Sequence, residues 1–407
     1  MHQEFRSLER SLPGKPEPAG VAAGAAAVED VSLSVHCDPA AVESAWRGLE
    51  PHSVTSIYQR FDWVETWCRQ AAPTIGVTPA LVVGSRRGRP LFLLPLGTRS
   101  RRLGRVAEWL GGSHVNNGMG VFDRAFAASL DRATARRLFH HVLVALAPVD
   151  VVALRNQPFA WQGVDNPLRH LAGRVEDQPV LAIPLQASFE AMIAGQDGAR
   201  RRKKMRWQEN TLAPVGGYRF FKAETHEEAD GLFGAFLRQK AVQFAQSGID
   251  NVFAEAGAEP FFRDLIRGAI DRRDPLIELY GLEIDGEIRA TFAAGAHDGR
   301  VQGYFNGINL DQYQRVSPGE LLLYNLVRDS CRRGLGMVDL GVGDERYKAS
   351  WHAVAERQFA TFLPATLRGR AAAALMMGAL SVGMRVRRSD AAWAVVKKMR
   401  RWVAGRR

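Results

Sequence analysis

A group of polar side chains late in the chain has the residue types that group transfer needs. Asp344, Glu345, Tyr347 and Lys348 follow a short apolar segment that predicts a strand, and the carboxyl ends of strands often carry catalytic groups in α/β folds. Either carboxylate could act as a general base, and the phenol could protonate a leaving group or orient an acceptor. The ammonium could neutralise a phosphate or a developing oxyanion. A surface salt-bridge network would have the same composition, and Asp339 is a further candidate for the base.

A loop upstream of this group is suited to holding a diphosphate. Residues 320–333 have apolar side chains at helical spacing, so they predict a helix that begins directly after Gly319. The free N–H groups and the positive dipole end of a helix attract an anion, and glycine lets a ligand approach the backbone closely. An ordinary loop–helix junction with proline in the first turn would look the same. The candidate cofactor-binding residues are Arg315, Val316, Ser317, Pro318, Gly319 and Glu320.

Three predicted strands lead into this loop. Residues 276–284, 287–297 and 301–309 are largely apolar and are separated by Asp-Gly pairs, which are typical of tight hairpin turns. Polar and aromatic side chains on or just after the third strand could contact a sugar by stacking and hydrogen bonding, although ordinary strand packing would use the same residue types. These candidate substrate-binding residues are Tyr304, Asn306 and Tyr313.

The segment after the predicted helix is similar to a known family signature. Residues 337–351 read Met-Val-Asp-Leu-Gly-Val-Gly-Asp-Glu-Arg-Tyr-Lys-Ala-Ser-Trp, which resembles the motif of CelD-type acetyltransferases, a branch of the GNAT superfamily. Ser317-Pro318-Gly319 followed by three leucines also resembles that family. The resemblance is densest over residues 200–363 and continues more weakly from residue 56.

The resemblance implies an acyltransferase that takes acetyl-CoA, or another acyl-CoA, as its cofactor at residues 315–320. It also implies direct transfer to a hydroxyl or amine of a carbohydrate, an exopolysaccharide or an envelope precursor, with Asp344, Glu345, Tyr347 and Lys348 in catalysis. One feature departs from the wider superfamily. Residues 314–319 contain one glycine, whereas a typical GNAT loop is glycine-rich.

The order of predicted elements indicates an α/β fold with two GNAT-like halves, each a mixed central sheet flanked by helices. A chain of 407 residues has room for two domains of ordinary size. The predicted divisions are a disordered lead over residues 1–30, an N-terminal half over 31–187, a basic connecting helix over 188–217, a C-terminal half over 218–365 and a basic amphipathic tail over 366–407.

The net charge of +11 is concentrated in the tail. Residues 368–407 hold eleven Lys or Arg side chains and one acid, so they carry +10 and leave +1 for the rest of the chain. This distribution disfavours a nucleic-acid-binding role for the whole protein. Residues 391–403 predict an amphipathic helix in which tryptophans alternate with basic side chains. Such a helix could lie on an anionic membrane surface or could dock on the protein with its basic face in water.

A basic run at residues 200–206 leaves other functions open. Arg202 and Arg206 could contact the phosphates of an acceptor, or the run could be the solvated face of a helix. A Fem-like transferase that depends on aminoacyl-tRNA would use the run and the tail as RNA contacts, but the nearly neutral body counts against it. A non-catalytic adaptor on a GNAT fold would act through the tail at a membrane surface.

Cysteine usage favours a reducing compartment. Cys37, Cys68 and Cys331 are far apart and form no Cys-x-x-Cys pair, which argues against a disulfide framework and a cysteine-based zinc site. No metal-ligand motif is present, and no segment reads as a signal peptide or a spanning helix. The expected location is the cytoplasm, with peripheral contact at the inner face of the membrane if the tail binds lipid.

Overall fold

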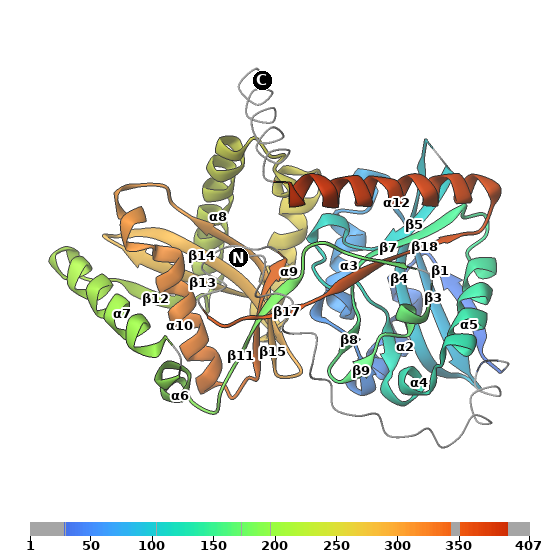
Figure 1. Cartoon of the computed structure of the whole chain (residues 1–407), viewed down its shortest axis with the longest axis horizontal. Coiled ribbons are helices and arrows are strands. Elements are labelled where there is room, and N and C mark those ends of the chain that lie inside the picture. Colours follow the sequence, from blue (N-terminus) through green and yellow to red (C-terminus); the bar gives the residue numbers. More distant parts are fainter. Residues whose placement is uncertain are drawn as a thin grey trace.

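Two mixed sheets flanked by helices lie side by side, as the sequence predicts (Figure 1). The computed structural model describes residues 28, 30–102, 104–171, 173–195, 197–342 and 351–389. The predicted lead, apart from residues 28 and 30, and the predicted amphipathic helix over 391–403 lie outside the described residues. Within the described part of the chain, no helix has the length and apolar character needed to cross a membrane.

The first sheet is built around the hairpin of β3 (Thr78–Arg86) and β4 (Arg89–Arg101). Arg87 and Gly88 both have positive φ angles, 50° and 79°, as a tight hairpin turn requires. The strand order is β1-β3-β4-β5-β7-β18-β10, and a short strand, β6, pairs with both β4 and β2. The other strands are β1 (Ser32–His36), β2 (Ser53–Val54), β5 (Gly104–Trp109), β6 (Val121–Asp123), β7 (Val151–Pro158), β10 (Gly173–Val175) and β18 (Gln358–Pro364).

Helices cover both faces of the first sheet. Two successive helices, α4 (Arg124–Ser129) and α5 (Arg132–Ala145), lie between β6 and β7. The break occurs because the Asp131 carboxylate accepts a hydrogen bond from the Thr134 N–H at 2.8 Å and so starts a new helix. The remaining helices of this half are α2 (Glu43–Leu49), α3 (Phe61–Gln70) and α12 (Leu367–Arg388). A small hairpin of β8 (Ala160–Trp161) and β9 (Val164–Asp165) stands apart from the sheet.

The second sheet contains the predicted meander of β13 (Glu278–Ile284), β14 (Glu287–His297) and β15 (Arg300–Ile308). Both Asp-Gly turns have two residues with positive φ, which confirms the predicted tight turns. The full strand order is β12-β13-β14-β15-β16-β11-β17. The added strands are β11 (Val180–Pro184), β12 (Arg219–Lys222), β16 (Met337–Val342) and β17 (Val354–Glu356).

Alternate residues of the meander face two different helical layers. Ala293 and Phe305 pack in the cluster that holds α8 (His226–Ser247) and α9 (Ala258–Arg272). Phe292 and Ala294 pack in the cluster that holds α10 (Pro318–Arg332) and two further helices, α6 (Phe189–Ala194) and α7 (Gly198–Leu212). The basic connecting helix predicted over residues 188–217 is two helices, α6 and α7, and Asp197 with φ 63° lies at the break.

The two halves exchange strands. β11 belongs to the sequence range predicted for the first half, yet it lies between β16 and β17 in the second sheet. β18 belongs to the range predicted for the second half, yet it lies between β7 and β10 in the first sheet. The sheets therefore do not divide at residues 187 and 218.

A shared hydrophobic core fixes the halves against each other. α3 packs on α9, and the rings of Trp63 and Phe261 meet edge to face at 5.0 Å between centroids. Tyr58 of the first half meets Tyr304 of β15 at 5.3 Å in the same geometry. These rings belong to, or pack against, one cluster that draws residues from both halves, so a site near the boundary can use side chains of both.

Candidate functional site

β15 and β16 run parallel but separate after three residue pairs. Residues 300–302 of β15 pair with 337–339 of β16, and from Gly303 onward the only described partner of β15 is β14. Tyr304 is an extra residue at this point, because Ala293 faces Phe305 while Ala294 faces Gly303. Within the described part of the chain, this separation leaves β15 without a second strand partner beyond Gln302, so backbone groups on that edge could bind a ligand.

A pocket of about 650 Å³ lies at the end of this edge. Its walls are the last part of α8, the end of β15 and the first turn of α10. Apolar lining comes from side chains such as Phe292 and Leu322, and polar lining from Lys240, Gln243 and Asn306. A site that is partly apolar and has a few convergent polar groups suits a ligand with both a polar and an apolar part.

The first turn of α10 presents a free backbone donor to this pocket. The helix begins at Pro318, two residues before the predicted start, after Ser317 with φ 53°. The N–H groups of Glu320 and Leu321 bond to the Ser317 carbonyl at 3.0 and 3.2 Å. The N–H of Gly319 has no intrahelical acceptor, so it and the helix dipole can serve an anion. A Cβ at Gly319 would lie 3.0 Å from Ile308 Cγ2, so the turn is already closely packed.

Four of the six predicted cofactor residues line the pocket, namely Ser317, Pro318, Gly319 and Glu320. The other two do not. Val316 is buried in the core, and its carbonyl accepts a hydrogen bond from Gln208 Nε2 at 2.6 Å. Arg315 is exposed on the loop.

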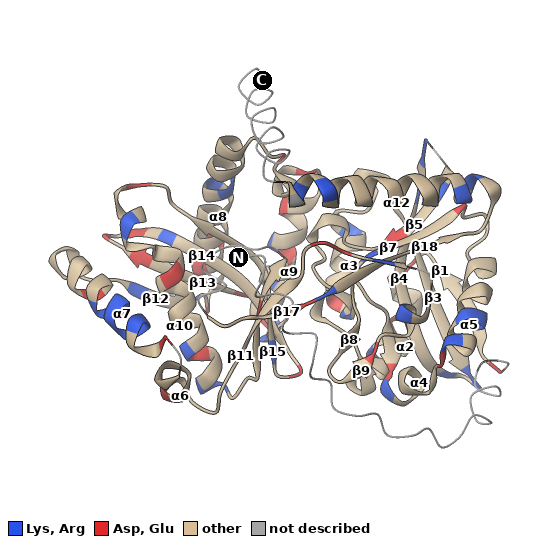
Figure 2. Ribbon diagram, in the orientation of Figure 1, with Lys and Arg blue, Asp and Glu red and all other residues tan. Residues whose placement is uncertain are grey.

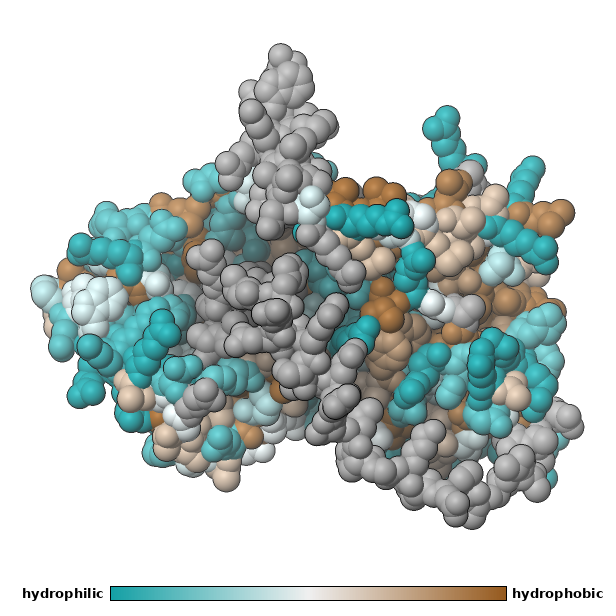
Figure 3. Space-filling model, in the orientation of Figure 1, coloured by the Kyte–Doolittle hydropathy of each residue, from teal (hydrophilic) through white to brown (hydrophobic). Residues whose placement is uncertain are grey.

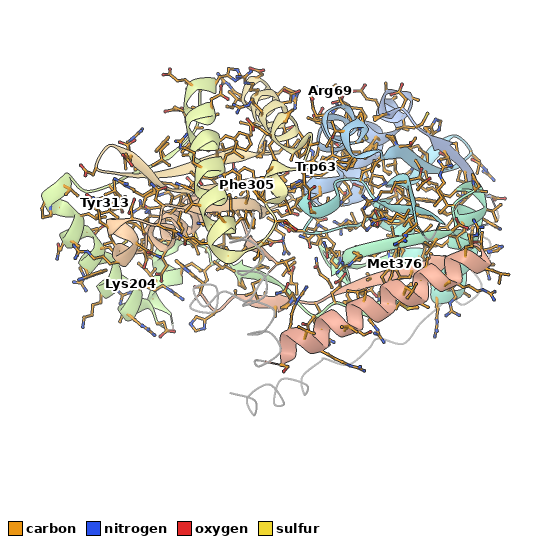
Figure 4. All side chains as sticks on the ribbon, turned by 90° about the horizontal axis from the view of Figure 1, so that it is seen from above. Trp63, Arg69, Lys204, Phe305, Tyr313 and Met376 are labelled. Atoms are coloured by element: carbon orange, nitrogen blue, oxygen red, sulfur yellow. The ribbon has the colours of Figure 1, made fainter. Side chains whose placement is uncertain are left out.

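α7 brings a cation to the same turn. Lys204 forms an ion pair with Glu320, and one helical turn further on Gln208 holds the Val316 carbonyl. The predicted residues Arg202 and Arg206 are exposed and do not line the pocket; Arg202 donates to the Ile193 carbonyl. Figure 4 shows Lys204 at the end of the second half that lies away from the first. Lys204 was not identified as a site residue in the sequence analysis. A usable signal was its spacing of four residues from Gln208, with the buried Met205 between them, because residues four apart lie on one face of a helix.

The three predicted substrate residues lie in three different places. Asn306 lines the pocket. Tyr304 is buried beside Tyr58, its hydroxyl donates to the Leu276 carbonyl at 2.9 Å, and burial raises its pKa. Tyr313 lies in the loop between β15 and α10, and its hydroxyl donates to Asp285 in the β13–β14 turn at 3.0 Å, with the Arg289 guanidinium over its ring. The structure therefore places one of the three, Asn306, at the pocket.

The predicted catalytic residues Asp344, Glu345, Tyr347 and Lys348 lie outside the described residues, so their roles stay predictions. The described chain on either side is Val342, which ends β16, and Trp351. Trp351 is buried, with the Arg201 guanidinium 4.5 Å from its ring centroid.

Asp339 lies at the last residue pair before β15 and β16 separate, and its contacts hold the strands together there. It is 1% exposed, and its Oδ2 accepts from Arg300 at 3.1 Å and from Asn117 Nδ2 at 3.2 Å. Its Oδ1 accepts from the Gly341 N–H at 2.7 Å. Burial raises the pKa of Asp339, although Arg300 opposes the shift. Arg300 also pairs with Glu356 of β17, so these contacts join three strands and assign Asp339 a structural role.

Side chains of the first half form hydrogen bonds at the point where β15 and β16 separate. Tyr58 Oη and Asn116 Nδ2 both donate to the Gly303 carbonyl, at 3.0 and 3.1 Å. Gly303 directly follows the last β15–β16 pair, so its carbonyl would otherwise lack a strand partner. No signal in the sequence connects these residues, because they are far apart along the chain. Among the described residues, no group of three His, Cys, Asp or Glu side chains could hold a metal ion.

Comparison with known proteins agrees with this geometry. Residues 199–349 match the family model described as an acetyltransferase (GNAT) domain. Over these residues the chain is similar to a GNAT domain. The matched segment runs from α7 past β16, so it includes the residues that line the pocket, the first turn of α10 and the predicted catalytic residues. The match does not distinguish the CelD-type branch from other GNAT branches.

Solved structures resemble both halves together. FemX is 11% identical, with a TM-score of 0.54, over 82% of this chain and 97% of FemX. The C-terminal domain of a proposed lysylphosphatidylglycerol synthetase from Agrobacterium fabrum is 11% identical, with a TM-score of 0.51, over 82% of this chain and 95% of that domain. Identities this low show a shared fold alone. A comparison with curated protein sequences gives no match.

Proposed function

We propose that this protein transfers an acetyl or other acyl group from acyl-CoA to a hydroxyl or amine of a carbohydrate or envelope precursor. The observation that carries the proposal is the pocket at the separated strands, next to the first turn of α10. The acceptor class rests on the resemblance of residues 337–351 to CelD-type acetyltransferases.

The residues present fit an acyl-CoA. A diphosphate would take the Gly319 N–H, the positive end of α10 and the charge of Lys204. The unpaired edge of β15 would bind the extended, amide-containing arm by backbone hydrogen bonds, as an added strand is bound. The donor would supply the activated acyl group. Asn306 lines the same pocket and would help to orient the arm.

The proposed chemistry is direct transfer. The acceptor oxygen or nitrogen forms a bond to the acyl carbon, the carbon–sulfur bond breaks, and the acceptor proton passes to a base. In our proposal Asp344 or Glu345 is that base, Tyr347 protonates the leaving thiolate, and Lys348 stabilises negative charge. No covalent enzyme intermediate is needed.

An aminoacyl-tRNA donor is the second candidate, and the surface of α7 favours it. Beside Lys204 this helix exposes further basic side chains, and Trp207 is 47% exposed among them. Basic side chains with an exposed aromatic ring suit single-stranded nucleic acid. The exposed residues that would contact the RNA end are Arg200, Lys203, Arg206 and Trp207.

Calorimetric titration with acetyl-CoA tests the proposal. The parent protein should bind, and Gly319→Glu should weaken binding at least about tenfold, because the new carboxylate meets the diphosphate. Gly231→Glu is the matched control. It adds the same charge on α8, where a Cβ meets nothing within 4 Å, and should bind as the parent does.

Either of two results would contradict the proposal. The first is that the parent binds neither acetyl-CoA nor longer acyl-CoAs. The second is that both glycine variants bind equally well, which would move the donor away from the first turn of α10. In the first case, tRNA binding at physiological salt would test the second candidate.

Glu320→Gln should tighten acyl-CoA binding by roughly fivefold. The Glu320 carboxylate lines the pocket and pairs with Lys204, so its removal frees the ammonium and takes away a negative charge near the diphosphate. Loss of an acid from the first turn should lower the free energy of unfolding by about 1 kcal/mol or less. Glu287→Gln, which neutralises an acid on the β14 hairpin with 67% of its side chain exposed, should leave the affinity unchanged. Weaker binding by Glu320→Gln would show that the donor phosphates lie elsewhere.

A further inference from the structure

α12 lies across the outer face of the first sheet with one face turned inward. Thr366 caps its start, and a Cβ at Gly369 would lie 1.8 Å from the Asp150 carbonyl oxygen, so the helix begins in close contact with the sheet. Ala372 and Ala373 are buried against β5, β7 and β18, and Met376 and Leu380 pack beside them. Figure 1 shows the helix lying along the upper edge of the first half.

The opposite face of α12 is apolar and has no partner among the described residues. Leu367, Leu375 and Val382 are 80%, 58% and 58% exposed, at positions that share one side of the helix. The small residues between them on this face, Ala371, Ala374 and Gly378, are exposed as well. Figure 3 shows hydrophobic residues along this edge of the surface. Such a continuous stripe differs from the scattered exposed apolar residues that are normal on a protein surface.

The charged residues of α12 are all basic and lie near its two ends. Residues 371–384 are uncharged, arginines stand at both ends, and residues 366–389 contain no acid (Figure 2). None of the described arginine side chains of this helix takes part in an ion pair with the described chain. Residues 390–407, which follow the helix in sequence, add six basic side chains, one acid and two tryptophans.

We propose that α12 lies flat on an anionic lipid surface through this face. Leu375 and Val382 would enter the boundary between headgroups and acyl chains, and the arginines at both ends would meet lipid phosphates. The absence of acids favours an anionic surface over a protein partner, which would offer charges of both signs. The proposal is independent of the proposed acyl transfer.

Vesicle sedimentation of the full-length protein tests the proposal. The protein should sediment with vesicles of phosphatidylcholine and phosphatidylglycerol in equal parts, and much less with phosphatidylcholine alone. The double variant Leu375→Glu and Val382→Glu should bind the mixed vesicles at least about tenfold less tightly. Arg385→Gln should lower the affinity for the mixed vesicles about fivefold. Val144→Glu is the matched control, because Val144 is 64% exposed on α5, which packs on β1, and it should bind as the parent does.

Circular dichroism and thermal unfolding of each variant would separate lost binding from lost folding. Three outcomes would overturn the proposal. These are no sedimentation of the parent with mixed vesicles, equal sedimentation of the parent and the double variant, and a dimer in sedimentation velocity that the double variant abolishes. The last outcome would assign the face to a second copy of the chain.

Discussion

Arg300→Met should lower the free energy of unfolding by about 3–5 kcal/mol, since it leaves a buried carboxylate without its cation. Arg300 Nη2 lies 3.1 Å from Asp339 Oδ2 and 2.5 Å from Glu356 Oε2, and its guanidinium stacks on Trp161. Asp339 would keep only the hydrogen bonds from Asn117 and Gly341. Urea unfolding at neutral pH, followed by circular dichroism, would measure the loss.

Two further variants test whether the loss comes from the unpaired buried carboxylate. Arg69→Met also removes an arginine that joins the two halves, because Arg69 pairs with Asp264 of α9 at 2.8 Å. The Arg69 side chain is 49% exposed, so we expect a cost of about 1 kcal/mol or less. Figure 4 shows this exposed position. Adding Asp339→Asn to Arg300→Met should restore part of the stability, because the buried charge is then gone. A loss below about 1 kcal/mol in Arg300→Met alone would contradict the structural role of the network.

Stability should fall by about 3 kcal/mol between pH 6.5 and pH 4 because of His114 alone. Its ring lies between Phe262 and Phe253, at centroid distances of 5.2 and 5.5 Å, and burial lowers its pKa from 6.5 to about 4. The unfolded chain therefore binds a proton at this position at a higher pH than the folded chain does. The contribution is complete above pH 6.5 and is lost as the pH falls through 6.5 toward 4.

The difference between the parent and His114→Phe isolates this contribution from the carboxylates. As the pH falls from 6.5 to 4, the free energy of unfolding should fall by about 3 kcal/mol more in the parent than in His114→Phe, because the phenylalanine has no proton to bind. Phe253→Leu is the control, since it removes one ring contact and keeps the imidazole. It should lower stability at every pH and retain most of the parental slope. Parallel curves for the parent and His114→Phe would show that the imidazole titrates as it does in the unfolded chain.

Local patterns in the sequence predicted the second sheet well. The two Asp-Gly pairs correctly marked the turns of the meander, because positive φ angles at both turn residues restrict the residue types. The apolar spacing of residues 320–333 predicted α10, and Gly319 identified the turn that faces the pocket. These features depend on residues that are neighbours in the chain, so the sequence shows them directly.

Longer-range features were missed for a physical reason. β11 and β18 are ordinary short strands, and nothing in their residues states which sheet they join. The residues that close the opening, Tyr58 and Asn116, approach Gly303 only after both halves have folded. Side-chain direction was a second source of error, because the bulge at Tyr304 turns that ring into the core.

The amino-acid sequence by itself determined the type of fold, the glycine turn at the start of α10 and the concentration of positive charge in the tail. Each of these follows from residue type and spacing over a few turns of chain. The tertiary structure decided that Lys204 is the cation at that turn, that Asp339 is structural, and that one face of α12 is left uncovered. Such properties depend on which distant surfaces meet, and the free energy of those contacts is set by burial and charge pairing in the folded chain.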